Sequence, residues 1–259
     1  MSPSLAEVAR LLAAPWHRDG YTLNAGPGGL VLSRKGLHVA TFEADWPKRR
    51  PPEDEVLAAA LEGIMARIPR HAALTVRIFD GWSRLSVVQW PAGLHGRSER
   101  KAYLQMAFAD SFGVGPWRIV SADATPRMPV VACAIAESLL ATVNDACRAR
   151  SVALRSLRPR WFDAVELCGH ACRSGRGGLL VFDSGVATLG YWDDGAWRGI
   201  RTQFAGMALH EGWASLSHAL LPAREIDAPA IVHCVGRVPP AGLMLPAGWA
   251  AQVHAEGRA

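Results

Sequence analysis

The stretch LLVFDSGVATLGYWDDGAWRGIR, residues 179–201, has the pattern of consecutive short strands. Its opening run, Leu179–Phe182, is wholly apolar, which is typical of a buried strand. A second strand is expected to follow and to end at Asp193-Asp194-Gly195, which predicts a tight turn because glycine tolerates the positive φ that hairpin turns require. We therefore expect a meander of three strands that ends near Phe204.

The turn after the first of these strands carries the candidate nucleotide-binding residues, Asp183, Ser184 and Gly185. An aspartate there can face a bound metal–phosphate group, and a glycine beside it lets backbone N–H groups approach the phosphates. The same tripeptide is also an ordinary hairpin turn, since aspartate and serine bond nearby backbone and glycine adopts positive φ. The residues alone leave both interpretations open.

Composition places the chain among globular proteins. It has 259 residues, half of them apolar, which is enough for one large domain or two small ones. The net charge of +5 is not concentrated in a basic run interleaved with stacking aromatics, so we predict no nucleic-acid partner. The sequence has neither a run of 18 apolar residues nor a signal-peptide pattern at its start. The expected location is the cytoplasm, with no membrane span.

Motifs for metal binding and catalysis are weak. Five cysteines fit a reducing compartment, and the segment Cys168–Cys172 has two of them at Cys-x3-Cys spacing. A second pair of ligands is missing nearby, so we predict no metal site there. His210-Glu211 lacks the second histidine of a metalloprotease helix, and Ser184 does not form a nucleophile elbow. No catalytic residue is predicted.

Strands and helices alternate along the chain, which predicts an α/β fold with mixed sheets. We expect a loop over 20–29, strand hairpins over 30–43 and 74–90, the second turning at Asp80-Gly81, and a weakly patterned tail after residue 235. Helices are expected over 4–14, 53–68, 99–112, 137–150, 160–168 and 207–219, and a strand over 230–235. Both halves have the order hairpin, helix, strand, so we predict a topological duplication, with the second half abbreviated. The predicted bounds are an N-terminal helix and loop over 1–28, a first half over 29–150, a connecting segment over 151–177, and a second half with its tail over 178–259.

Several segments carry a resemblance to a known family: Trp117–Val120, Val130–Ile135, Leu139–Val143, Leu154–Pro159 and Gly178–Gly185. Over about residues 28–235, the chain resembles the actin-like cytoplasmic proteins of type IV pilus and type II secretion assembly, the PilM-like and GspL-like group. The resemblance implies an actin-like (RNase H-like) fold whose two mixed-sheet halves pack about a cleft. It places Asp183-Ser184-Gly185 at the family's second phosphate motif.

The phosphate motifs of this family are incomplete in the chain. Its members begin with an Asp-x-Gly loop, whereas the predicted first turn, Ser33–Gly36, has no acidic residue. The late Gly-Gly element that contacts adenine is not evident either. We therefore expect a non-catalytic scaffold without a cofactor, and weak or no binding of ATP with Mg²⁺. The alternative is a nucleotide-binding actin-like ATPase that uses Asp183 in the cleft.

The resemblance also implies a protein partner, either a membrane-anchored assembly protein or a secretion or pilus ATPase, and leaves a homodimer open. Such a partner would hold the chain at the inner face of the cytoplasmic membrane. The predicted hairpin 74–90 carries Arg77, Trp82 and Arg84, side chains of the kinds that are common at binding hot spots. We expect Trp82 and Arg84 to be exposed for docking; the alternative is that Trp82 and Trp90 pack the hairpin onto its helix.

Overall fold

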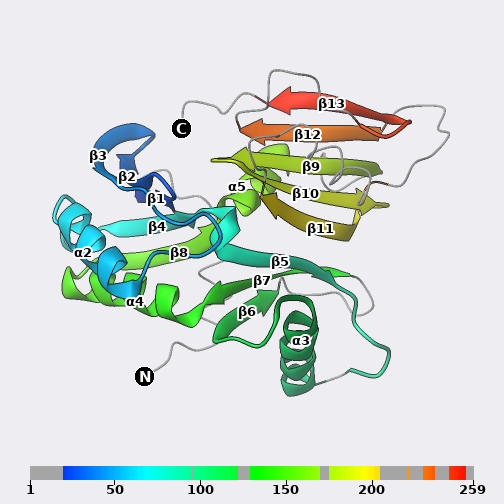
Figure 1. Ribbon diagram of the computed structural model, residues 1–259, viewed down its shortest axis with the longest axis horizontal. Coiled ribbons are helices and arrows are strands. Elements are labelled where there is room, and N and C mark those ends of the chain that lie inside the picture. Colours follow the sequence, from blue (N-terminus) through cyan, green and yellow to red (C-terminus); the bar gives the residue numbers. More distant parts are fainter. Residues whose placement is uncertain are drawn as a thin grey trace.

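The computed structural model describes residues 20–94, 96–121, 129–169, 175–204, 221, 230–236 and 245–254. Within them the chain forms two five-stranded sheets and one three-stranded sheet (Figure 1). The helices expected at residues 4–14 and 207–219 lie outside the described residues. In the part of the chain that is described, no helix is long and apolar enough to cross a membrane.

The first sheet has the strand order β3-β2-β1-β4-β8. β1 pairs antiparallel with β2 and parallel with β4, so the sheet is mixed. Helices α2 and α4 contact each other and pack against this sheet, where they bury its leucine-rich face. The elements are β1 (Tyr21–Gly26), β2 (Gly29–Arg34), β3 (Leu37–Glu43), α2 (Asp54–Met65), β4 (Ala73–Ile78), α4 (Glu137–Ala149) and β8 (Ala153–Pro159).

The second sheet repeats this arrangement with the order β11-β10-β9-β12-β13. Its first strand in the chain is again antiparallel to the next and parallel to the fourth, so the two sheets share both order and orientation. The predicted meander and topological duplication are therefore confirmed. Its strands are β9 (Arg176–Asp183), β10 (Val186–Asp193), β11 (Ala196–Phe204), β12 (Ala230–Gly236) and β13 (Trp249–His254).

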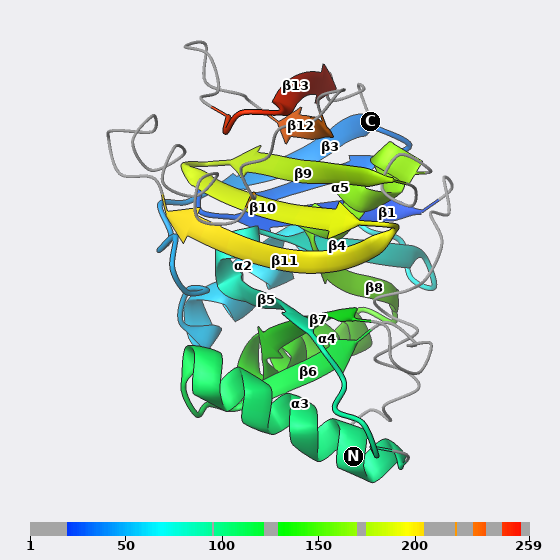
Figure 2. The same ribbon diagram turned by 90° about the vertical axis from the view of Figure 1, so that its right-hand side faces the viewer.

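The second half is abbreviated, as predicted. Only residues 237–248 separate β12 from β13, whereas residues 79–152 separate the corresponding strands β4 and β8. That long insertion contains the third sheet, of order β5-β7-β6, with α3 packed on it below the two larger sheets (Figure 2). Its elements are η1 (Asp80–Trp82), β5 (Ser83–Val88), α3 (Arg97–Phe112), β6 (Trp117–Ser121) and β7 (Val130–Ala136).

Three local predictions are wrong. Residues 20–29 are not a loop, because Tyr21, Leu23 and Ala25 are buried in alternation and form the central strand β1. Residues 74–90 are not a hairpin, since β4 belongs to the first sheet and β5 to the third. The tail after residue 235 was expected to be weakly patterned, but it contains the strand β13. This strand pairs in parallel with β12, which was predicted. The first sheet thus includes β1 and β8, which lie outside the bounds 29–150.

Helix α5 (Arg160–Cys168) follows β8 directly and connects the two large sheets. It contacts both β8 and β9, and lies where the sheets approach each other (Figure 1). The largest apolar cluster runs from the first sheet through Trp161 of α5 to Trp192 and Ile200 of the second sheet. The two halves therefore share one continuous core at this junction.

Candidate inter-sheet site

Asp183 ends β9 at the junction of the two sheets, and both of its carboxylate oxygens are occupied. Arg160, the first residue of α5, donates from Nη1 to Asp183 Oδ2 over 2.7 Å. The Ser184 hydroxyl donates to Asp183 Oδ1 over 2.9 Å. The predicted residues Asp183 and Ser184 therefore contact each other. Asp183 also faces Arg160, which was not predicted to belong to the site.

The turn around Ser184 has the geometry of an ordinary hairpin. Ser184 and Gly185 both have positive φ, 46° and 80°. The turn at Asp194-Gly195 has nearly the same pair, 52° and 71°. Two consecutive residues at positive φ are the mark of a type I′ turn, whose twist matches that of the flanking strands. The backbone of this turn is thus accounted for without a phosphate.

A second aspartate, Asp80, lies near Asp183 and Arg160, two residues after the end of β4. It is 2 % exposed, and its Oδ1 accepts the backbone N–H of Trp161 over 3.0 Å. The first N–H groups of a helix have no intrahelical acceptor, so Asp80 satisfies one of them in α5. Burial raises the pKa of Asp80 to about 7; the Asp183 charge adds to the rise, and the Trp161 hydrogen bond opposes it.

Gly81 allows this position for Asp80. A Cβ at Gly81 would overlap the carbonyl oxygen of Lys48 and lie 2.6 Å from the Phe79 ring. No side chain fits there, so glycine is required for the short helix η1 to bring Asp80 against α5. Asp80-Gly81 was predicted to be a turn. Its contact with α5 could not be read locally, because Trp161, whose N–H binds Asp80, lies 81 positions away.

Replacement of Asp80 by asparagine is expected to flatten the pH dependence of stability. The pKa of Asp80 is about 7 in the folded chain and has an ordinary value of 3.8, so the folded state holds the proton more tightly. That contribution to stability is complete below about pH 4 and is lost as the pH rises to about 7. At about 1.4 kcal/mol per pKa unit, the loss amounts to ~4 kcal/mol, and asparagine does not incur it.

Urea unfolding at pH 5 and pH 8 measures the part of this loss that falls between those two pH values, about 2–3 kcal/mol. Between pH 5 and pH 8 wild type loses stability as Asp80 ionises. Asp80→Asn does not ionise, and its amide oxygen still accepts the Trp161 N–H, so the variant should gain stability relative to wild type. Asp110→Asn, at an exposed position of α3, is the control and should track wild type. Parallel pH profiles for Asp80→Asn and wild type would contradict the assignment.

Arg77, which was predicted to take part in docking, belongs to a network of ion pairs that fixes α5 to the first sheet. Its Nε lies 2.6 Å from Asp163 Oδ2, and Arg158 Nη2 lies 2.6 Å from Asp163 Oδ1. Arg158 also makes a bidentate pair with Glu166, at 2.7 and 2.8 Å. Arg77 and Arg158 are paired neighbours on parallel strands, so two cations of the sheet hold two acids of the helix.

The predicted exposure of Trp82 is wrong. Its side chain is 1 % exposed, and its indole N–H donates to the Pro47 carbonyl over 2.8 Å. Arg84 is half-buried, bonds the carbonyls of Gly81 and Ser83, and places its guanidinium 5.5 Å from the centre of the Trp117 ring. The structure therefore assigns Trp82 to the core, as the alternative interpretation held, and the docking role of this trio stays a prediction.

The turn that corresponds in position to the family's first phosphate motif also lies elsewhere than expected. Because β1 is a strand, the first hairpin is β1–β2, and its turn is Pro27-Gly28. This turn, and not Ser33–Gly36, is the topological counterpart of the turn after Asp183. It carries no acidic residue either. Residues 20–29 were predicted to be a loop because the glycines and the proline of residues 26–29 outweighed the strand pattern that precedes them.

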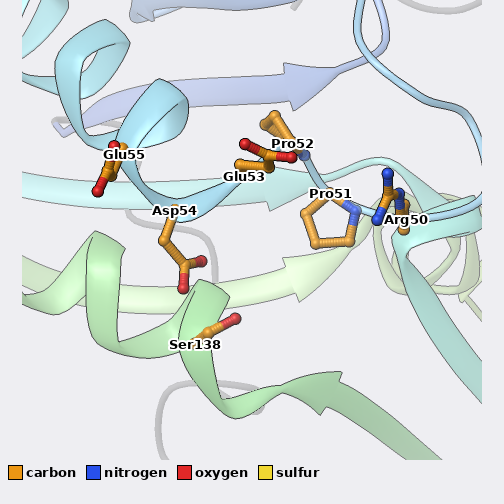
Figure 3. Close-up of a pocket in the computed structure, with 7 residues that line it drawn as sticks. All are labelled: Arg50, Pro51, Pro52, Glu53, Asp54, Glu55 and Ser138. Atoms are coloured by element: carbon orange, nitrogen blue, oxygen red, sulfur yellow. The ribbon is translucent and has the colours of Figure 1, made fainter.

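A surface hollow lies away from this site, at the start of α2 (Figure 3). It is lined by Arg50, Pro51, Pro52, Glu53, Asp54, Glu55 and Ser138. Asp54 and Glu55 occupy the first turn of α2, where acidic side chains complement the helix dipole. Three carboxylates against one arginine make the hollow unfavourable for a nucleotide, whose phosphates are anionic.

Comparison with known proteins adds information on the fold. No family model matches the sequence, and no characterised protein matches it at the sequence level. Among solved structures, the cytoplasmic domain of EpsL, an inner-membrane component of the type II secretion system of Vibrio cholerae, is similar with a TM-score of 0.55 and 10 % identity. The match covers 92 % of this chain and 89 % of EpsL's.

A chain of the PilM–PilN type IV pilus biogenesis complex is similar with a TM-score of 0.52 and 14 % identity. This match covers 76 % of the present chain and 65 % of the other, so the chain spans less than two thirds of that relative. The predicted resemblance is confirmed for the fold. Two sheets of identical strand order, joined through α5, and these two similarities show that the chain has the actin-like α/β fold.

Proposed function

We propose that this protein is a non-catalytic actin-like scaffold of a pilus or secretion-system assembly platform. In this role it binds a membrane-anchored protein or an assembly ATPase, and lies at the inner face of the cytoplasmic membrane through that partner. The similarity to the cytoplasmic domain of EpsL, part of an inner-membrane component, and to a chain of the PilM–PilN complex supports the assignment.

The observation that carries the proposal is the state of the two phosphate turns. The β1–β2 turn has no carboxylate, and the Asp183 carboxylate is engaged by Arg160 and Ser184. Mg²⁺ with a nucleotide needs carboxylate oxygens free to hold the ion or its waters, and phosphoryl transfer depends on that positioning. A chain that keeps the fold without these groups fits a binding role better than hydrolysis.

Strand β3 is the surface that best fits a partner. It is an edge strand of the first sheet, so one side of its backbone has no neighbouring strand in the described structure. Leu37 is 74 % exposed, and Val39 and Phe42 are each 40 % exposed. Extended peptides bind such edges by adding a strand, with main-chain hydrogen bonds for affinity and apolar side chains for specificity.

Photo-crosslinking in the native cell tests the proposal. A photoreactive amino acid at position 37 should form an adduct with a membrane-anchored protein or an assembly ATPase, identified by mass spectrometry of the membrane fraction. The matched control is position 253, which is 60 % exposed on β13, the edge strand of the other sheet. Leu37→Glu should abolish the interaction, whereas Val253→Glu should leave it intact.

Other outcomes distinguish the alternatives. An adduct only with a second copy of this chain would indicate a homodimer in place of the scaffold. Micromolar binding of ATP with Mg²⁺ that disappears in Asp183→Ala, measured by calorimetry, would favour the nucleotide-binding ATPase. Absence of any membrane-protein or ATPase adduct, from position 37 or from a set of positions across the surface, would reject the proposal.

A further inference from the structure

Three side chains with metal-ligating atoms converge where α5 meets the second sheet. Cys168 is the last residue of α5, His233 lies on β12 and His254 lies on β13. Each offers one ligand atom, and the three atoms lie within 4.8 Å of one another. Among the residues that the structure describes, no other group of three histidine, cysteine or acidic side chains has this geometry.

The sheet register explains why the two histidines meet. β12 and β13 are parallel, with His233 opposite Gln252 and Val235 opposite His254. Residues two apart on a strand point to the same face, so His233 and His254 are diagonal neighbours on one face. The His233 Nδ1 and His254 Nε2 atoms lie 2.8 Å apart, so the nitrogens of the two rings already face each other.

Packing holds this arrangement in place. Cys168 and His233 are each 8 % exposed, whereas His254 is half-buried. The Trp192 ring lies parallel to the His233 ring, at 13° between planes and 6.2 Å between centroids. Gly177 gives the indole room, because a Cβ at that position would overlap the Trp192 ring. The His233 imidazole is therefore oriented by its neighbours before any ligand arrives.

We propose that Cys168, His233 and His254 form a binding site for a zinc ion. One thiolate sulfur and two imidazole nitrogens are a donor set that suits Zn²⁺, which prefers sulfur and nitrogen ligands in tetrahedral geometry. Three protein ligands leave a fourth position for water. Nitrogen ligands about 2.0–2.1 Å from a tetrahedral zinc lie about 3.3 Å apart, so the two imidazole nitrogens, now 2.8 Å apart, must separate slightly. The ion then replaces the hydrogen bond between them.

The site would connect the two halves of the fold. Cys168 is joined through α5 to β8 of the first sheet, whereas the two histidines belong to the outer strands of the second sheet. A metal that binds the folded chain and not the unfolded one adds its binding free energy to stability. Zinc therefore acts here as a cross-link between halves, independently of the proposed scaffold role.

Metal titration of untagged protein, after removal of metals with a chelator, tests the site. Co²⁺ serves as a spectroscopic probe, and Zn²⁺ is then used to displace it. We expect one equivalent of Co²⁺ to give a thiolate-to-cobalt charge-transfer absorption that is absent from Cys168→Ser. Cys147→Ser, at another buried cysteine, is the matched control and should keep both the absorption and the affinity.

His254→Asn is a second variant, chosen because His254 is only half-buried and the fold should tolerate the change. Even loss of a residue that merely supports a ligand costs about 10–100-fold in metal affinity, so loss of a ligand should weaken Zn²⁺ binding by at least that factor. His38→Asn, on β3, should bind as wild type does. Absence of stoichiometric binding, or equal affinity in wild type and His254→Asn, would overturn the proposal.

Discussion

Replacement of Trp82 by alanine will lower the free energy of unfolding by about 3–5 kcal/mol. The indole is 1 % exposed and lies 6.0 Å from the Trp46 ring and 6.1 Å from the Phe79 ring, measured between centroids. Alanine would leave a cavity between these rings, and the Pro47 carbonyl would lose its indole donor. The surrounding backbone is fixed by the tight packing at Gly81, so the cavity cannot collapse easily.

Equilibrium unfolding in urea measures this loss. Trp117→Ala is the control, because Trp117 is only half-buried on β6 and should cost clearly less. The result bears directly on the docking hypothesis for this residue. A Trp82→Ala protein of unchanged stability that no longer bound its partner would restore Trp82 to the interface, whereas a large loss of stability assigns it to the core.

Removal of Arg158 has the second largest expected effect, a loss of about 3–5 kcal/mol in Arg158→Ala. The Arg158 side chain is 3 % exposed, and its guanidinium pairs with both Asp163 and Glu166. Breaking a buried ion pair by deleting one partner is costly because the other charge stays buried. Here that charge is Asp163, whose side chain is 15 % exposed, whereas Glu166, at 42 %, reaches solvent. Arg77 still contacts Asp163, but Glu166 would lose both of its hydrogen bonds to Arg158.

Two further variants test whether the loss of stability comes from the bidentate pairing of Arg158 or only from the removal of a positive charge. Arg158→Lys keeps the charge but not the planar fork that allows bidentate pairing, so its stability should fall between those of Arg158→Ala and wild type. Arg148→Ala removes an exposed arginine that pairs with Asp145 on α4, and should cost no more than about 1 kcal/mol. If Arg158→Ala and Arg148→Ala were equally stable, the network would not secure α5.

Local patterns were sufficient to predict most elements. The apolar run before Asp183 and the glycine turns of the meander identify β9, β10 and β11 without reference to the rest of the chain. The apolar stripe and the capping signals did the same for α2, α3 and α4. β1 was missed because Gly20 and the glycines after Ala25 outweighed the alternation of its buried residues, which a count of period-2 matches would have detected.

The site depends on contacts that no local pattern encodes. Asp80 meets Trp161, and Arg160 meets Asp183, across long separations in sequence. In the sequence, Cys168 is close only to Cys172, four residues away, whereas its two histidine neighbours in the fold are 65 and 86 positions further on. Residues brought together by the pairing of distant strands become visible only when the sheet order is known.

The long insertion between β4 and β8 has a consequence for synthesis on the ribosome. Domains fold from the N-terminus as the chain emerges, at about 5–20 residues per second. β4 must therefore wait roughly 4–15 s for residues 79–152 before β8 can pair with it. During that interval its far edge is open, and Leu74, Val76 and Ile78, all buried in the finished sheet, have no cover from α4 or β8. The nascent chain is most exposed to aggregation, and to chaperones that bind apolar strands, along β4.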